Sequence, residues 1–562
     1  MTSTARSVDA APAGKLPAPA AEAAPPKGSD PSNGFLAKAA LVTAVLTVAG
    51  AVLGLGRDQA LAHFFGAGSE TDAFLVAWTV PEVATTLLIE DGLAFALVPA
   101  FSMALARRRS VREDPVRALV AATLPRLSLA FAGVGLVLMA KAPHLVALLA
   151  PGLPDPRLAV DCTRLTATCA LSFGLAGYCS AVLRAHRRFV APAAIYVAYN
   201  VGIIGTVLVL DGRGGVRSAA LGVAVGGVLM VAVQAPSLWW QLRRRPALTP
   251  GGTASGTATG DAAAARLMSG ALIATVLLFA LCRQSQVLIE RFLASSLPAG
   301  AISHLNYAQK VAQVPMILSL MLCTVTLPVV AQALAEGDVK RARSRVERDL
   351  GLASCVVLLG TAVVIACAPQ IIQLLFQRGA FTPADTTATA AVMRVYALGL
   401  IGHTLVGALV RSYFSGHRVT WYPLGAMAVG VAATAAIGSR AVDLWGVRGI
   451  ALANATGISL TAIVLLCGMG PSNVPIRVRR VLAELVKPAA AMACATGFGA
   501  AVSLRVASPP VGVAAGSLTV AGVFALVLWV LRAKSFKPVA RSIRSVIRSV
   551  VRSVTRKRSH VR

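Results

Sequence analysis

Apolar runs of about twenty residues recur along most of the chain, separated by short polar segments. A helix of about twenty apolar residues crosses roughly 30 Å of hydrocarbon, so each run predicts a transmembrane helix. The pattern therefore predicts an all-α polytopic membrane protein with about 14 spans. The predicted spans are 36–55, 72–105, 118–140, 160–184, 190–210, 217–241, 267–293, 303–334, 350–375, 387–413, 421–438, 446–468, 485–504 and 511–532.

Basic residues follow the even-numbered runs in clusters and are sparse after the odd-numbered runs. Arg243, Arg244 and Arg245 follow the sixth run, for example, whereas only Arg505 follows the thirteenth. Loops rich in Lys and Arg stay in the cytoplasm. The alternation therefore predicts that every even-numbered loop and both termini are cytoplasmic.

Composition agrees with a membrane protein. Hydrophobic residues make up 56% and charged residues 14%, with a mean hydropathy of +0.72, whereas soluble domains carry about 25% charged residues. The net charge of +30 does not indicate nucleic acid, because the basic residues lie in short clusters between apolar runs. The nine cysteines lie within apolar segments and lack CxxC spacing, so we expect no disulfide framework, no metal and no cofactor.

Composition also divides the chain into segments. A Gly/Thr/Ala-rich stretch falls midway and predicts a flexible linker between two six-helix bundles. The two bundles share weak motifs and the same orientation, which predicts a parallel pseudo-repeat. The predicted segments are a disordered cytoplasmic tail (1–34), an N-terminal bundle (35–248), a cytoplasmic linker (249–264), a C-terminal bundle (265–470), two further helices (471–534) and a basic tail (535–562).

The basic tail carries arginines at helical spacing, from Arg541 to Arg556, with Ile and Val on another face. Such an amphipathic helix binds anionic lipids of the inner leaflet. We therefore expect 541–556 to lie on that leaflet; the alternative is a β-branched, Ser-rich tail that stays disordered in water.

The second run carries charge within its apolar length. Glu82, Glu90 and Asp91 lie inside it, and Pro81 and Gly92 interrupt its helical pattern. A charge at membrane depth faces a cavity or a partner, and a broken helix at that depth needs protein or water beside it. The run predicts a bent polar helix that lines a path through the membrane.

Several motifs together resemble those of the MurJ (MviN) family, the proposed lipid II flippases of the MOP exporter superfamily. The resemblance covers roughly residues 36–534. It rests on Gly56-Arg57-Asp58, FGAGSETDAF (65–74), Pro81, Glu90, FALVP (95–99), ERFLAS (290–295), LNYA (305–308), Pro315 and LLFQRGAFTPAD (374–385).

The resemblance implies a flippase in the bacterial cytoplasmic membrane, not an enzyme. It would move a polyprenyl-pyrophosphate-linked peptidoglycan precursor, lipid II, from the inner to the outer leaflet by alternating access. The lipid tail would stay in the bilayer while the polar head crosses a central cavity. Lipid II, membrane lipids and cell-wall synthesis proteins are the implied partners, with no nucleic acid.

The chain also departs from the family pattern. Neutral residues or a lysine stand where the family has arginines or acids, and the eleventh span (422–437) has no Asn or Asp. The departures are Ala51, Thr85, Thr86, Gln309, Lys310 and Gln313. Either the head group differs, or other cations replace the missing ones.

Nine residues form the predicted substrate-binding or gating set. For Arg57 the alternative is a helix-end pair with Asp58, and for Asp72 it is a helix N-terminal cap. Glu90 and Asp91 either couple to protons or cations, or pair with cytoplasmic arginines. The set is Arg57, Asp72, Glu90, Asp91, Arg164, Arg283, Glu290, Lys310 and Arg394.

The last two arginines of the set precede corresponding spans of the two halves. Arg164 and Arg394 either grip phosphate or close an outer gate by pairing with Asp161 and Glu290. Two further functional hypotheses stay open: an exporter of another polyprenyl-linked glycan or of a drug-like cation, and a transport-inactive scaffold for cell-wall synthesis.

Overall fold

The computed structural model describes residues 33–90, 92–107, 114–210, 214–243, 270–321, 338–414, 420–469 and 476–531. The regular elements in these ranges are helices, with no strand, which confirms the all-α prediction. Asp91, residues 1–32 of the predicted N-terminal tail, the predicted linker and the predicted basic tail lie outside the described residues.

The first group of helices, called here the N-terminal group, precedes residue 244. Within it, α1 packs along α9, α9 along α10, and α8 against α4, α5 and α10. Its helices are α1 (Asn33–Phe65), α2 (Ser69–Ala77), α3 (Thr79–Ala84), the π-helix η1 (Thr85–Glu90), α4 (Gly92–Arg107), α5 (Pro115–Ala140), α6 (Ala142–Leu149), α7 (Pro156–Ala167), α8 (Cys169–Ala185), α9 (Val190–Val209) and α10 (Arg217–Arg243).

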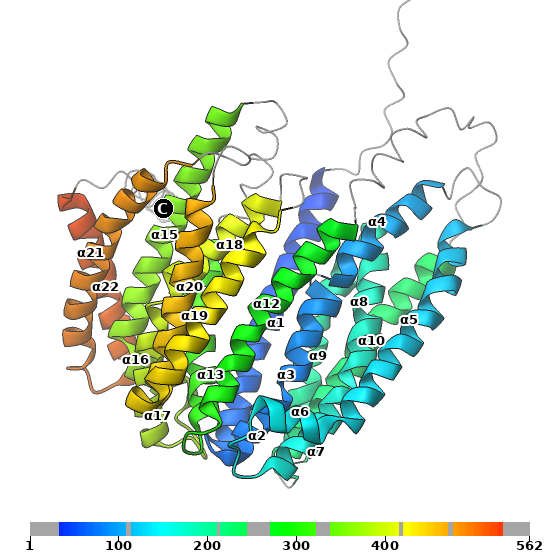
Figure 1. The fold of residues 1–562 in the computed structure, drawn as a ribbon, viewed down its shortest axis with the longest axis horizontal. Helices are drawn as coiled ribbons and strands as arrows, with labels where there is room; N and C mark the ends of the chain where they lie inside the picture. Colours follow the sequence, from blue (N-terminus) through cyan, green and yellow to red (C-terminus); the bar gives the residue numbers. More distant parts are fainter. Residues whose placement is uncertain are drawn as a thin grey trace, which may run out of the picture.

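The second group, called here the C-terminal group, runs from α12 to α20 and is followed by a pair of helices. The pair α21 and α22 packs on α15 and α16 at the edge of the molecule (Figure 1). The helices are α12 (Gly270–Ala294), α13 (Ala301–Ala312), α15 (Val339–Ala366), α16 (Ala368–Phe376), α17 (Pro383–Ala397), α18 (Leu400–Phe414), α19 (Tyr422–Trp445), α20 (Val447–Cys467), α21 (Val478–Ser503) and α22 (Pro509–Val530).

Eleven helices in the described residues are long and apolar enough to cross a membrane, or twelve when the pair α17 and α18, bent by 48°, counts as one span. This confirms a polytopic membrane protein. The full count of fourteen, the pseudo-repeat and the domain boundaries stay predictions.

The predicted bend in the second span is present. Residues 69–107 form four helical pieces, α2, α3, η1 and α4. The hydroxyls of Thr85 and Thr86 donate to the backbone oxygens of Pro81 and Glu82, at 2.8 and 3.3 Å. Such back-bonding competes with the helix ladder and bends helices, and a π-turn often marks a functional position.

Connections 66–68, 295–300 and 377–382 lie at the same end of the molecule (Figure 1). This end is called the outer end below, because the basic residues predict that the opposite end is cytoplasmic. Figure 1 shows α12 on the side of the C-terminal group that faces the N-terminal group. It contacts α19 and α20, and also α3, η1, α4 and α6.

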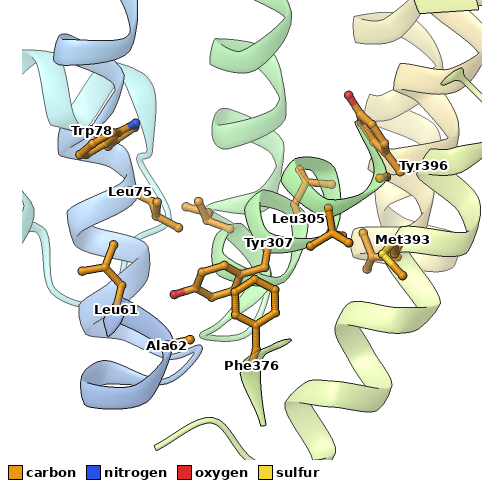
Figure 2. Packing of buried hydrophobic residues seen from close by; sticks show 14 of the residues in the cluster. Leu61, Ala62, Leu75, Trp78, Leu305, Tyr307, Phe376, Met393 and Tyr396 are labelled. Atoms are coloured by element: carbon orange, nitrogen blue, oxygen red, sulfur yellow. The ribbon is translucent and has the colours of Figure 1, made fainter. Parts of the chain in front are cut away.

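The main hydrophobic core crosses the boundary between the groups. Leu61 and Leu75 of the N-terminal group lie near Tyr307 of α13 and Phe376 of α16 (Figure 2). The Tyr307 and Phe376 rings are 4.9 Å apart between centroids, and such aromatic pairs contribute about 0.5–1.5 kcal/mol beyond their area. This core therefore packs the two groups of helices against one another.

Candidate functional site

Arg57 and Asp58 form a buried ion pair on α1. Arg57 is 8% exposed and Asp58 4%. The Nε and Nη2 atoms of Arg57 donate to Asp58 Oδ1 at 3.0 and 2.8 Å, and Nη1 donates to Asn200 Oδ1 of α9 at 3.2 Å. The Arg57 guanidinium also lies 4.4 Å from the centroid of the Trp78 ring. The predicted pairing of Arg57 with Asp58 is therefore present, but it is buried rather than located at the helix end.

Lys310 joins this pair from the other group of helices. Its Nζ lies 3.2 Å from Asp58 Oδ1 and 5.6 Å from the Trp78 ring centroid. One carboxylate oxygen thus accepts from two cations that come from α1 and α13. Because two positive charges share one negative charge, this cluster has a local positive excess.

A second ion pair links the groups nearby. Arg291 Nη2 of α12 lies 2.7 Å from Glu82 Oε2 of α3, and Arg291 Nη1 donates to Thr79 Oγ1. The Arg291 side chain is 4% exposed and that of Glu82 34%. Neither residue belongs to the predicted set, although both are charged residues inside apolar runs. Sequence reasoning identified the charges but could not show that they pair.

Asp72 forms a third polar connection across the boundary. Its carboxylate accepts hydrogen bonds from the backbone N–H of Gly300 and of Ser303, both at 2.7 Å, and from the Ser303 hydroxyl. These groups belong to the first turn of α13, whose N-terminal N–H groups lack partners within the helix. Asp72 is therefore a cap, but it caps α13 of the other group instead of its own helix.

Backbone contacts also join the two groups at the outer end. The N–H of Ala380 donates to the His63 carbonyl at 2.9 Å, and the N–H of Gly152 donates to Ser295 Oγ at 3.3 Å. Together with the ion pairs and the Asp72 cap, these contacts close the outer end in this structure.

Glu290 belongs to a separate polar network inside the C-terminal group. It is 2% exposed and accepts a hydrogen bond from Asn454 Nδ2 of α20. Asn454 Oδ1 lies 3.1 Å from His403 Nε2 of α18, which lies 3.3 Å from the Tyr396 hydroxyl of α17. Gln309 and Gln313 donate to that hydroxyl, each at 3.1 Å.

The remaining predicted residues lie apart from these clusters. Glu90 is exposed and accepts from the Tyr196 hydroxyl at 3.2 Å. Arg164 and Arg283 are exposed, and the Nε of Arg394 donates to the Ile365 carbonyl at 3.2 Å.

The pairings predicted for an outer gate do not occur in this structure. Asp161 pairs instead with Arg217, at 2.8 Å between Oδ2 and Nη2, and Glu290 is bound by Asn454. The pairing alternative for Arg164 and Arg394 is therefore wrong for this structure, because residues that match in the two halves of the sequence meet different neighbours; their contact with phosphate stays a prediction.

No group of three or more His, Cys, Asp or Glu residues within the described ranges could hold a metal ion. The clusters are instead buried ion pairs that join two groups of helices. They can exchange a protein carboxylate for a ligand anion, or separate when the groups move.

Comparison with known proteins adds to this geometry. The sequence profile of the family described as Lipid II flippase MurJ matches residues 61–534. The chain belongs to the MurJ family. The Lipid II flippase MurJ of Burkholderia cenocepacia is 28% identical to it over 444 residues, which cover 76% of this chain and 84% of the relative. The Probable lipid II flippase MurJ of Thermotoga maritima is 28% identical over 429 residues, which cover 75% of this chain and 83% of the relative.

Solved structures agree on the fold. A Lipid II flippase MurJ in an inward closed conformation matches with a TM-score of 0.70 and 19% identity, covering 87% of this chain and 99% of that chain. An inward-facing multidrug resistance MATE family transporter of the MOP superfamily matches with a TM-score of 0.59 and 15% identity, and the match covers 79% of this chain and 99% of that chain. The MurJ family resemblance in the sequence is thus confirmed, and the fold is shared with the wider superfamily.

Proposed function

We propose that the chain is a lipid II flippase, which moves this polyprenyl-pyrophosphate-linked peptidoglycan precursor from the inner to the outer leaflet by alternating access. The observation that carries the proposal is the Arg57–Asp58–Lys310 cluster between two groups of helices, in a chain that belongs to the MurJ family over residues 61–534. The named relatives supply the substrate.

The physical task fits these residues. A pyrophosphate-linked sugar cannot cross hydrocarbon alone, because burying its charges without partners is too costly. Arg57 and Lys310 offer two cations that share one protein carboxylate. A phosphate that approaches them takes over part of that pairing, so the cations bind the anion without being left uncompensated. Lysine binds as a point charge, whereas an arginine would bind phosphate in a bidentate manner.

Alternating access requires that the outer contacts break. The Glu82–Arg291 and Asp58–Lys310 pairs and the Asp72 cap all cross the boundary between the groups. When the groups separate, water replaces each partner, so opening costs less than the buried pairs suggest. We propose that these three connections form the outer gate. Glu90, Asp91, Arg164, Arg283 and Arg394 remain proposed contacts of the path.

One observation favours a second candidate, the export of another polyprenyl-linked glycan. Thr85 and Thr86 occupy η1 where the family pattern has basic residues, and both hydroxyls are bound to their own helix. Fewer cations on that helix suit a head group that carries less negative charge or carries it elsewhere.

Further proposals concern surroundings and partners. Both termini lie in the cytoplasm, the basic tail at 541–556 binds the anionic inner leaflet, and cell-wall synthesis proteins are partners. The distribution of arginines along the sequence supports the first two proposals, since basic segments stay on the cytoplasmic side and bind anionic lipids.

The decisive experiment is translocation of fluorescent lipid II in proteoliposomes that contain the full chain. We expect the unmodified protein to translocate lipid II and Lys310→Met to lose most of the rate, because Arg57 then only balances Asp58 and no positive charge remains in excess to bind the phosphate. Lys141→Met, at an exposed outer position, is the matched control and should keep the rate.

Translocation of a different polyprenyl-linked glycan, but not of lipid II, would establish the second candidate. Rescue of a bacterium depleted of its own lipid II flippase provides the same test in cells. Failure to transport any lipid-linked glycan would support the scaffold hypothesis instead.

A further inference from the structure

Glu290 is a buried carboxylate whose bonded partner is neutral. It is 2% exposed and accepts from the Asn454 amide. The adjacent cation, Arg291, is committed to Glu82. A carboxylate held this way gains much from binding a proton, because neutralisation removes the cost of a buried charge.

The network around Glu290 can adjust to that proton. Asn454 connects Glu290 to His403, and His403 connects to Tyr396. With Glu290 ionised, Asn454 Nδ2 donates to the carboxylate while His403 Nε2–H donates to Asn454 Oδ1. With Glu290 protonated, its O–H donates to Oδ1 of the turned amide, and Nδ2 donates to His403 Nε2 of the other tautomer. Both arrangements use the same heavy-atom positions, because amide and imidazole orientations differ only in hydrogen placement and an exchange of N and O.

The surroundings favour a proton over a metal ion. Asn454 presents an N–H to the carboxylate, whereas metal cations require several oxygen ligands. The described residues contain no cluster of three or more acidic, His or Cys side chains. Several titratable and charged groups lie on α12 and on the elements packed against it, besides His403 of the network. They are the Cys282 thiol, Arg283 and Arg291 (α12), Glu82 (α3), Glu90 (η1), Arg107 (α4), His144 (α6), His304, Tyr307 and Lys310 (α13), Tyr422, Arg440 and Asp443 (α19), and Arg448 and the Cys467 thiol (α20).

Two adjacent residues on α12 bond to different groups of helices. Glu290 bonds within the C-terminal group, while Arg291 reaches across to Glu82. A change of charge at Glu290 is therefore felt directly at the ion pair that crosses the boundary.

We propose that Glu290 is a proton-binding site whose occupancy sets the strength of the Glu82–Arg291 bridge. The reaction is a simple protonation, in which the carboxylate and one proton from water give the carboxylic acid. The link to transport rests on the proposed flippase function, whereas proton binding itself does not.

The charges decide whether protonation of Glu290 strengthens or weakens the Glu82–Arg291 bridge. An ionised Glu290 helps to compensate Arg291 when Arg291 leaves Glu82, so the bridge separates more readily. A protonated Glu290 offers no such compensation, so Arg291 stays on Glu82. Protonation therefore favours the closed outer end, and loss of the proton favours opening.

Infrared difference spectroscopy of the purified full-length protein tests proton binding. We expect a carboxylic-acid carbonyl band that titrates with pH, is absent in Glu290→Gln and shifts in frequency in His403→Gln. Glu484→Gln, at a pair with Arg480 in the first turns of α21, is the matched control and keeps the band. A spectrum that is the same in Glu290→Gln and in the unmodified protein would overturn the proposal. Should Glu290→Gln not fold, an unchanged band in His403→Gln would do so.

Distances between spin labels test the coupling. Labels at Pro154→Cys and Ser296→Cys, two exposed positions on opposite sides of the outer contact, are placed in a background with Cys282, Cys323, Cys467 and Cys494 replaced by alanine. We expect a longer distance to gain population as pH rises, and Glu290→Gln to hold the short distance at every pH. A label distance that does not change with pH in the protein that keeps Glu290 overturns the proposed coupling. Failure of the unmodified protein to translocate lipid II overturns the flippase proposal instead, and leaves the infrared result standing.

Discussion

At the residue scale, Asp58 is a buried carboxylate that two cations share. It is 4% exposed and is the shared partner of Arg57 and Lys310. Two cations on two helices are thus held by one carboxylate. An ionised Asp58 offsets one of the two positive charges, so its removal affects both cations at once.

The substitution Asp58→Asn tests whether Asp58 stabilises both cations. We expect a loss of about 3–5 kcal/mol in the free energy of unfolding, because removing one partner of a buried pair leaves uncompensated charge. Thermal unfolding in detergent and the translocation rate are the measurements. The double variant Asp58→Asn with Lys310→Met should recover part of the stability, since one of the two stranded cations is gone. If the double variant were as unstable as the sum of the singles, the two residues would not be coupled.

At the element scale, α13 depends on a residue outside its own group. Its N-cap position is Gly300, with φ of +94°, and the side chain that accepts from its first turn is Asp72. An alanine at 300 would place Cβ 2.6 Å from the Ala67 carbonyl oxygen, so glycine is required both by the backbone angle and by the close approach of α1–α2. The start of α13 is therefore built from both groups.

Asp72→Ala should destabilise the protein by about 1–2 kcal/mol, as expected for loss of an N-terminal cap. It should also speed hydrogen exchange at the amides of Gly300 and Ser303. Asp155→Ala is the matched control, because Asp155 caps α7 within its own group through the Leu158 N–H at 3.1 Å. Both variants should lose stability, but only Asp72→Ala should lengthen the distance between labels across the outer end. Equal distances in the two variants would show that the cap does not hold the groups together.

At the scale of the whole molecule, the outer end is closed by connections of different chemical kinds. The Glu82–Arg291 pair, the Asp58–Lys310 pair, the Asp72 cap and the Gly152–Ser295 hydrogen bond all join the same two groups. Each connection alone contributes only modestly to holding the two groups together. Because they lie on the same boundary, a rigid movement of one group breaks them together.

A charge exchange between Glu82 and Arg291 tests whether this boundary is the gate. Glu82→Arg and Arg291→Glu should each reduce translocation and open the outer end, because like charges then face one another. The double exchange should restore part of both properties, with a coupling energy of about 0.5–3 kcal/mol. Spin-label distances and translocation rates are the measurements, and a double exchange no better than either single would argue against a direct pair. The buried Thr79 contact of Arg291 limits how complete the rescue can be.

Much of the fold could be predicted from the sequence for one reason. Apolar runs must match the bilayer wherever they occur, so many predicted spans agree with the described helices to within a few residues; α9, for example, was predicted at 190–210 and occupies Val190–Val209. Helix ends were less accurate, since α1 was predicted to end at residue 55 and continues to Phe65. The break near Pro81 was also predictable, because proline, glycine and charge act locally.

The partners of the site residues were less predictable than the fold. The motifs and the charge at membrane depth singled out Arg57, Asp72, Glu290 and Lys310, but not which partner each one has. Glu82 and Arg291 were visible as charges, and their pairing joins positions 209 residues apart. The expected pairs of Arg164 and Arg394 were wrong for the same reason.

The sequence by itself thus determined that the chain is a polytopic helical membrane protein, where its second span bends and which apolar runs carry charge, because these follow from local composition and the thickness of the bilayer. Only the tertiary structure decided that Asp58 is shared by Arg57 and Lys310, that Asp72 caps a helix of the other group, and that Glu290 has a neutral partner. Those features depend on the packing of distant helices, which places groups side by side that no spacing along the chain relates.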